Sequence, residues 1–285
     1  MRQKKFMKKN IKKKFQKTIL DFGDEWERFD NNEVSEKELK KIFNSYFRIF
    51  PKKFFNKKKI GIDLGSGSGR WAKYIVSKIK KIYLLEPSIK AINVSKKRFK
   101  KFNNIEYLNM ESKKLNLKNN SLDFAYSLGV IHHLEYQIKY FKIINKKLKK
   151  NSPFLVYLYH NFENHSYLYK LIWKFSEIFR KIICKQNFFV KSTICEIIAF
   201  LVYLPLSKIS FFLDYMGFDT KNVPLSIYKD KSFYVMRNDS LDRFGTKYEK
   251  RYSTKSIINL FKKTGFYKIK ISTKEPYWCA IGYKK

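Results

Sequence analysis

The chain has 285 residues, and its 44% hydrophobic content is enough for one large α/β domain with a packed core, which excludes an intrinsically disordered protein. Lys and Arg outnumber Asp and Glu by 62 to 24, giving a formal net charge of +38. This charge would suit nucleic acid or an anionic membrane as a partner. However, the lysines are spread along the whole chain with abundant Asn, Ile, Phe and Tyr, as a genome rich in A and T would produce, so both interpretations stay open.

The cysteines and the N-terminus indicate the compartment. Cys184, Cys195 and Cys279 form no CxxC pair, and no histidine lies at metal-ligand spacing, so we expect a reducing environment and no metal site. Residues 1–16 are basic but lack the apolar stretch and cleavage site of a signal peptide. A cytoplasmic location is therefore predicted, with peripheral contact to the inner face of an anionic membrane as an open alternative. The oligomeric state is not predicted.

Between Lys58 and Tyr159, short β-branched or aromatic runs alternate with longer amphipathic segments, a pattern typical of βαβ units in a parallel sheet. The expected strands are Lys59–Leu64, Lys81–Leu85, Ile105–Leu108, Leu122–Tyr126 and Phe154–Tyr159. The expected helices are Arg70–Ile79, Ile89–Phe102 and His133–Lys149.

After Tyr159 the pattern changes to long apolar stretches, Tyr167–Cys184 and Ser192–Leu213, followed by a polar, turn-rich segment to about Tyr252. Ser253 is expected to cap a last helix, followed by strands Tyr267–Ser272 and Tyr277–Tyr283. Ser192–Leu213 is long enough to raise the question of a membrane span, but Glu196, Pro205 and Lys208 interrupt it, and we predict a cap over the sheet edge instead. The predicted organisation is a basic helical N-terminal segment (1–57), a core (58–160), a helical insertion (161–252) and a final helix with two strands (253–285).

The strongest motif is Ile60–Arg70, a strand that runs into three alternate glycines. Gly65, Gly67 and Gly69 allow a sharp turn and let the backbone approach a ligand with no Cβ in the way. A dinucleotide fingerprint has the spacing GxGxxG. Here the spacing is GxGxG with Asp63 two residues earlier, which resembles motif I of class I S-adenosylmethionine (SAM) dependent methyltransferases. An ordinary tight turn is the alternative if no other segment agrees.

Other segments do agree, in order and spacing. Glu86 ends the second strand roughly 20 residues beyond the glycines, where an acidic side chain can accept hydrogen bonds from both ribose hydroxyls. With Asn109–Ser112 after the third strand and Ser121–Leu134 around the fourth, the chain resembles the type 11 methyltransferase group from about Asp21 to Lys150 and again at its end. The resemblance implies a Rossmann-like α/β fold with a seven-stranded, mostly parallel sheet, a helical insertion after the fifth strand, and SAM as cofactor.

The same resemblance implies roles for individual residues. Asp63 and the glycine loop would hold the methionine end of SAM, Glu86 the ribose, and Met110 and Glu111 the adenine. Ser127 and Leu128 would lie near the methionine moiety. Arg70 could meet the methionine carboxylate, and Trp26 could pack on the sulfonium; an exposed arginine and a tryptophan that anchors a cap helix are the alternatives.

Segments in the insertion and near the C-terminus resemble a bacterial methyltransferase subgroup associated with surface-polysaccharide gene sets: Asn222–Ser226, Ser232–Arg237, Leu241–Thr246 and Pro276–Ala280. Polar residues concentrate there in otherwise apolar sequence, so we expect Arg237, Asp242, Arg243 and Tyr248 to bind substrate, with structural salt bridges as the alternative. The expected acceptor is a small molecule or a glycan- or lipid-linked molecule, methylated at oxygen.

A hydroxyl acceptor needs a base. His132 and His133 follow the fourth strand at the sheet end where α/β proteins bind ligands, and either could serve, although both could instead be structural. His160, after the fifth strand, is a further substrate-site candidate.

Other functions fit less well. A nicotinamide-dependent oxidoreductase would share the first βαβ unit, but not the glycine spacing. An RNA or protein methyltransferase would suit the charge, yet Ser127–Val130 lacks the Asn/Asp-Pro-Pro-aromatic motif that holds a flipped amino base, so nucleic acid is disfavoured. A non-catalytic SAM-binding or membrane-peripheral scaffold is disfavoured by the intact glycine loop.

Overall fold

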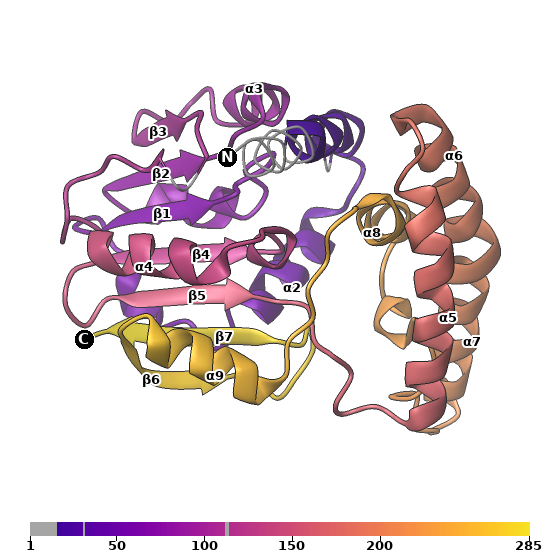
Figure 1. Ribbon diagram of the computed structural model, residues 1–285. Coiled ribbons are helices and arrows are strands. Elements are labelled where there is room, and N and C mark those ends of the chain that lie inside the picture. Colours follow the sequence, from indigo (N-terminus) through magenta and orange to yellow (C-terminus); the bar gives the residue numbers. More distant parts are fainter. Residues whose placement is uncertain (1–15, 31, 112–113) are drawn as a thin grey trace, which may run out of the picture.

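The computed structural model describes residues 16–30, 32–111 and 114–285. One seven-stranded sheet has the order β3-β2-β1-β4-β5-β7-β6, with β7 antiparallel to both neighbours and the other pairs parallel (Figure 1). The expected mostly parallel, Rossmann-like sheet is therefore confirmed. The strands are β1 (Ile60–Leu64), β2 (Lys81–Leu85), β3 (Ile105–Leu108), β4 (Phe124–Leu128), β5 (Pro153–Tyr157), β6 (Phe266–Ile271) and β7 (Cys279–Lys284).

Helices cover both faces of the sheet. On one face, α4 (Gln137–Lys147) and α9 (Thr254–Lys263) pack on apolar side chains of β1, β4 and β5. On the other, α2 (Glu36–Tyr46) and the short 3₁₀ segments Lys52–Phe54, Ala72–Tyr74 and Val76–Lys78 bury a cluster rich in phenylalanine. Helix α3 (Ile89–Arg98) follows β2. The expected cap of α9 is confirmed, because the Ser253 hydroxyl accepts a hydrogen bond from the Ser256 amide.

The three helix predictions in the core differ from the structure in type or extent. Helix α3 ends at Arg98 and not at Phe102. The segment expected as a helix from Arg70 to Ile79 forms two 3₁₀ turns, and its adjacent β-branched residues Ile75 and Val76 are fully buried. Burial of these β-branched side chains decides the local conformation, because their own preference for an α-helix is weak. Helix α4 begins at Gln137, not at His133, because Ile131–His133 forms a 3₁₀ turn that ends with extended backbone at Leu134.

The insertion is helical, and it contains one helix that we had expected as a loop. Helix α5 (Tyr167–Ile183) precedes a continuous helical run of α6 (Phe188–Ile198), a π turn (Ala199–Tyr203) and α7 (Leu204–Tyr215). After the 3₁₀ turn Ser226–Tyr228 comes α8 (Phe233–Gly245), capped by Ser232. The polar residues of α8, such as Asn238 and Asp242, gave it the composition of a turn-rich segment.

The N-terminal segment and the insertion share a hydrophobic core. Residues 16–28 are helical, and Phe29, Val34 and Leu39 pack with Tyr203, Tyr234 and other buried side chains of α6 to α8. In Figure 1 the helices α5, α6 and α7 form a layer beside the sheet, with α8 between this layer and the strand ends. Two segments far apart in sequence thus enclose the carboxyl edge of the parallel strands, where α/β folds bind ligands.

Candidate functional site

The glycine loop forms a tight turn at the end of β1. The Gly65 amide donates to the Leu85 carbonyl at 2.8 Å, and the Gly69 amide donates to the Ser66 carbonyl at 2.8 Å. Gly67 has a φ of +52°, and a Cβ on it would lie 2.6 Å from Cε2 of Trp26. The loop therefore needs glycine here both for its conformation and for the close approach of the indole.

Glu86 links the end of β2 to this loop. One carboxylate oxygen accepts from the Gly67 amide at 3.0 Å and the other from the Ser88 amide at 2.9 Å. Its exposed fraction is only 6%, yet it lines the main cavity. Burial raises the pKa of Glu86 to about 7, and the two amide donors partly oppose that rise.

Several buried oxygens near the loop have no hydrogen-bond partner among the described residues: Asp63 Oδ2, Ser66 Oγ and Ser68 Oγ. Burial raises the pKa of Asp63 to about 8, although the neighbouring Tyr126 hydroxyl favours the ionised form. Unpartnered buried polar atoms are costly. A polar ligand at the end of β1 could provide Ser66, which faces the cavity, with a partner.

Trp26 and Arg70 join the glycine loop to the N-terminal helix and α8. The Arg70 guanidinium lies 4.8 Å from the Trp26 ring and 4.5 Å from the Trp71 ring. Asn238 of α8 donates to the buried carboxylate of Glu25 at 2.8 Å. Burial raises the pKa of Glu25, and the negative charge of Asp242 adds to the rise. The N-terminal helix therefore contributes both an aromatic ring and a buried acid to the site.

The remaining residues predicted to contact the cofactor occupy different positions. Leu128 lines the cavity, whereas the Ser127 hydroxyl is buried and donates to the Leu64 carbonyl at 2.9 Å, tying β4 to β1. Met110 packs on the core beneath α4 and α9. The lining of the cavity includes neither Met110 nor Glu111, both of which lie in the described part of the chain.

A cavity of about 790 Å³ extends from the glycine loop into the insertion. Its wall includes Gly65, Arg70 and Glu86 at the loop, Tyr46 of α2, and side chains of α5 and α8. The cavity thus runs past the ends of β1, β4 and β5, between the sheet edge and the helices of the insertion, and its volume is that of a small-molecule site.

His133 lies on the cavity wall in a polar arrangement with Asp242 of α8. Its Nδ1 is 2.8 Å from the Tyr248 carbonyl oxygen, and its Nε2 is 3.6 Å from Asp242 Oδ1. Because a carbonyl only accepts, Nδ1 carries the proton and Nε2 faces Asp242. The Tyr159 hydroxyl also donates to Asp242. Burial lowers the pKa of His133, but the hydrogen bond and negative charge of Asp242 outweigh burial, so the pKa of His133 is raised overall.

His132 differs sharply from its neighbour. It is fully buried, its ring stacks on Tyr159 at 3.8 Å, and both ring nitrogens lack a partner among the described residues. Burial, followed by the charge of His133, lowers the pKa of His132. His132 is therefore held neutral behind the cavity wall that His133 helps to form.

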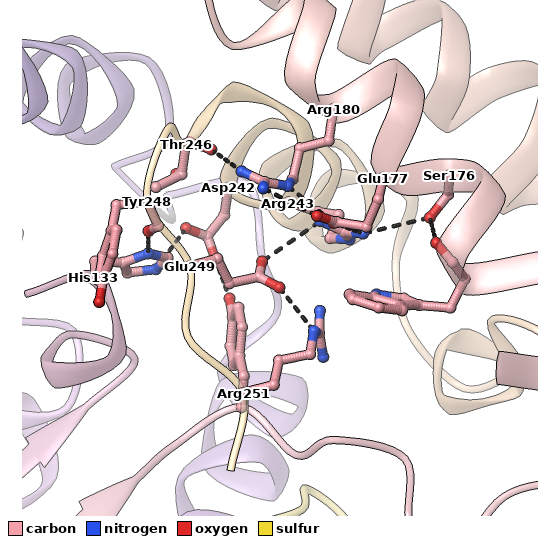
Figure 2. Close-up of polar contacts among 12 residues, drawn as sticks. His133, Ser176, Glu177, Arg180, Asp242, Arg243, Thr246, Tyr248, Glu249 and Arg251 are labelled. Carbon is pink, nitrogen blue, oxygen red and sulfur yellow. Dashed lines mark hydrogen bonds and ion pairs between the residues drawn. The ribbon is translucent and has the colours of Figure 1, made fainter.

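Figure 2 shows an alternating set of arginines and glutamates beside His133 and Asp242. Two members of this set, Arg243 and Arg251, line the cavity. Arg243 lies 2.5 Å from Glu177 and 3.5 Å from Glu249, and Arg251 lies 2.7 Å from Glu249. The Arg251 guanidinium also lies 4.5 Å from the Phe162 ring and 4.9 Å from the Trp173 ring. Ion pairs and aromatic rings hold these two guanidinium groups in place on the wall.

The residues predicted to bind substrate divide into two sets. His160, Asp242 and Arg243 line the cavity. Arg237 instead pairs with Glu196 of α6 through contacts of 2.6 and 2.9 Å, and Tyr248 contributes its backbone carbonyl to His133. Four further residues at the site, Glu25, Asn238, Tyr159 and Arg251, were not predicted from the sequence. Tyr159 could have been found from its place just beyond a central strand; the others depend on long-range packing.

Comparison with known proteins identifies a domain and a fold. The family model described as a methyltransferase domain, Methyltransf_11, matches residues 62–156. No curated protein matches the sequence.

Among solved structures, a SAM-dependent methyltransferase from Thermotoga maritima, described as a possible histamine N-methyltransferase, is 18% identical with a TM-score of 0.51 and covers 93% of this chain and 100% of its own. A possible exported protein from Bordetella parapertussis is 8% identical with a TM-score of 0.51, over 87% of this chain and 68% of its own. Phosphoethanolamine N-methyltransferase 2 from Haemonchus contortus is 16% identical with a TM-score of 0.49, and the match covers 88% of this chain and 43% of its own. At these identities, structural likeness shows the fold alone.

Proposed function

We propose that this chain, which carries a class I SAM-dependent methyltransferase domain matched at residues 62–156, methylates a hydroxyl oxygen of a small-molecule, glycan-linked or lipid-linked acceptor. The observation that carries the proposal is the single cavity that connects the glycine loop and Glu86 with the His133–Asp242 pair. It brings a nucleoside-binding corner and a proton acceptor to one continuous space.

Residues around the loop fit SAM. Glu86 offers a carboxylate for the ribose hydroxyls, and Ser66 and Asp63 offer buried oxygens without partners among the described residues. Arg70 would pair with the methionine carboxylate, and Trp26 lies against the same loop. Leu128 lies on the cavity wall, and Ser127, Met110 and Glu111, which lie outside the lining, complete the residues that the family resemblance assigns to the cofactor. When bound, SAM supplies a methyl group already activated by the neighbouring sulfonium, so the protein has mainly to position the acceptor and exclude water.

His133 is the proposed base. With its proton on Nδ1, it presents a lone pair on Nε2 that can take the proton of the acceptor hydroxyl. Asp242 then stabilises the resulting imidazolium, and Tyr159 keeps Asp242 in place. His160, Arg243 and Arg251 would contact the acceptor. Arg237 and Tyr248 would act on the acceptor site indirectly, through Glu196 and through the orientation of His133.

A cavity of about 790 Å³ favours a small or extended acceptor over a folded nucleic acid. We further propose a cytoplasmic protein that contacts the inner face of the membrane. A comparison of cell-envelope extracts with and without the gene by mass spectrometry tests the function: an envelope compound should lose the mass of one methylene. Isothermal calorimetry tests the cofactor directly, and a purified protein that ignores SAM but binds NAD would contradict the proposal.

Replacing Glu86 by glutamine should weaken SAM binding by about 1.5 to 3 kcal/mol, because hydrogen bonds to a charged acceptor contribute that much. Affinity of the wild type should also fall as the pH drops below about 7, since the raised pKa of Glu86 leaves less carboxylate to accept the ribose hydroxyls. The glutamine variant should lack this pH dependence. Glu106→Gln, on the partly exposed strand β3, is the matched control. Unchanged affinity in Glu86→Gln would place the ribose contact elsewhere.

A further inference from the structure

The helices of the insertion expose several large apolar side chains. On α5, Leu168, Phe175 and Phe179 are 65%, 62% and 48% exposed; on the helical run from α6 to α7, Phe200, Leu201 and Phe212 are 59%, 63% and 61% exposed. We call these six residues the outer face. Soluble monomers rarely expose so many large apolar side chains on neighbouring helices without a partner.

Polar side chains of α6 and α7, in contrast, are buried or paired within the protein. On α6, Lys191 is 2% exposed and pairs with Asp21 at 2.8 Å, and Glu196 pairs with Arg28 and Arg237. Ser207 and Ser210 of α7 are buried. Phe188–Tyr215 is, within the described residues, a helix long and apolar enough to cross a membrane by length and composition. Its paired charges would be lost in a bilayer core, so this helix suits a position along a membrane surface and not across it.

Charge distinguishes a membrane from other occupants of the outer face. Exposed lysines accompany the apolar residues on both helices: Lys174, Lys181 and Lys185 on and after α5, and Lys208 on α7. A second copy of a chain with a net charge of +38 would bring like charges together. An anionic lipid surface would accept both the apolar side chains and the lysines.

The cavity reaches these two helices. Ile172 of α5 and Val202 of the π turn both line the cavity, and they are 45% and 42% exposed. Tyr169 and Trp173 of α5 and Leu206 of α7 line the same end. The cavity thus has a polar end at His133 and Asp242 and a largely apolar end between the helices that carry the outer face.

We propose that the outer face docks on an anionic membrane and that the acceptor is a lipid or lipid-linked molecule, drawn from that membrane with its apolar chain between α5 and the α6–α7 run. The assignment of the acceptor rests on the proposed methyltransferase function, whereas membrane docking does not. The hydroxyl group of the lipid would reach His133 while its chain stays in contact with the bilayer.

Flotation of the full-length protein with phospholipid vesicles tests the docking. We expect the wild type to float with vesicles that contain phosphatidylglycerol. The double variant Phe175→Glu/Phe212→Glu should bind at least about tenfold more weakly, because each exposed phenylalanine would bury apolar area in the lipid. Both positions are exposed, so the fold should tolerate the change. Ile138→Glu on α4, where Ile138 is 48% exposed, is the matched control and should bind like the wild type.

Three results would overturn the docking. The first is a wild type that stays with the soluble fraction. The second is a double variant that floats as well as the wild type, which would assign binding to other basic residues such as those of residues 1–15. The third is a wild-type dimer, seen by light scattering, that the double variant converts to a monomer without any vesicle binding. SAM calorimetry on the same proteins separates these results from failure of the methyltransferase proposal, since docking variants should bind SAM normally.

Radiolabelled SAM tests the acceptor. After incubation with membranes of the source organism, the methyl label should enter the organic phase of a lipid extraction in the wild type and much less in the double variant. Label found only in water-soluble products would overturn the lipid acceptor.

Discussion

His133→Asn should lower the turnover number by about 10²- to 10⁴-fold, the usual contribution of a positioned base, and leave SAM affinity nearly unchanged. Asparagine can keep the hydrogen bond to the Tyr248 carbonyl that Nδ1 makes at 2.8 Å, so the loop that carries Tyr248 should stay in place. What the variant loses is the nitrogen that faces Asp242 at 3.6 Å. Turnover of radiolabelled SAM and calorimetry separate the two effects.

His132→Asn is the matched control for this prediction. The two histidines are adjacent, but His132 lies behind the cavity wall, stacked on Tyr159, and is held neutral by burial. The His132 variant should lose stability because a buried ring is replaced, yet its turnover per folded molecule should stay close to that of the wild type. Full activity in both variants would remove the pair from the mechanism.

The pH dependence gives an independent test of His133. Its pKa in the folded protein is raised, so turnover should increase as the pH rises through that value and the base loses its proton. Removing the negative neighbour with Asp242→Asn should lower the pKa of His133 and shift this rise to lower pH. The free energy of unfolding should change in the opposite direction. Charged His133 stabilises the fold fully below the pKa of histidine in the unfolded chain, about 6.5. This contribution is lost as the pH rises through the pKa of His133 in the folded protein.

Local patterns predicted the sheet well. Strands β2 and β3 were expected with their observed ends, and Ser253 was expected as the cap of α9, because alternation and capping are properties of neighbouring residues. The glycine spacing and Glu86 are also local signals, and the Gly67 amide does donate to Glu86. The 3₁₀ turns after the loop were missed, since tertiary packing of Ile75 and Val76 decides their conformation.

The polar pairs that build the cavity wall could not be predicted from the sequence, because their members lie far apart in the chain. Glu25 and Asn238 are separated by 213 positions, and no spacing rule connects them. Arg237 and Arg243 are close in sequence and chemically alike, yet one pairs with Glu196 outside the cavity and the other pairs with Glu177 on its wall. Their difference depends on which side of α8 faces the cavity, and α8 itself was expected as a loop.

Gly67→Val should reduce SAM affinity by at least about 100-fold, which corresponds to roughly 2.7 kcal/mol. Two costs combine at this position. A non-glycine residue at a φ of +52° costs roughly 1–2 kcal/mol, and a Cβ would lie 2.6 Å from the Trp26 indole, so the loop or Trp26 must shift. Such a shift would also move the Gly67 amide away from Glu86, the proposed ribose ligand.

Gly217→Val separates backbone strain from the effect on the site. Gly217 has a φ of +87° after α7, but nothing lies within 4 Å of a Cβ built on it. The Gly217→Val variant should therefore have a lower melting temperature than the wild type, whereas its SAM affinity in calorimetry should be unchanged. The double variant Trp26→Ala/Gly67→Val completes the test, because it removes the indole that the new side chain meets. If SAM approaches Gly67 directly, the double variant should bind SAM more weakly than Trp26→Ala alone. Equal affinity in these two variants would show that only Trp26 occupies that space and would contradict the proposed role of the glycine.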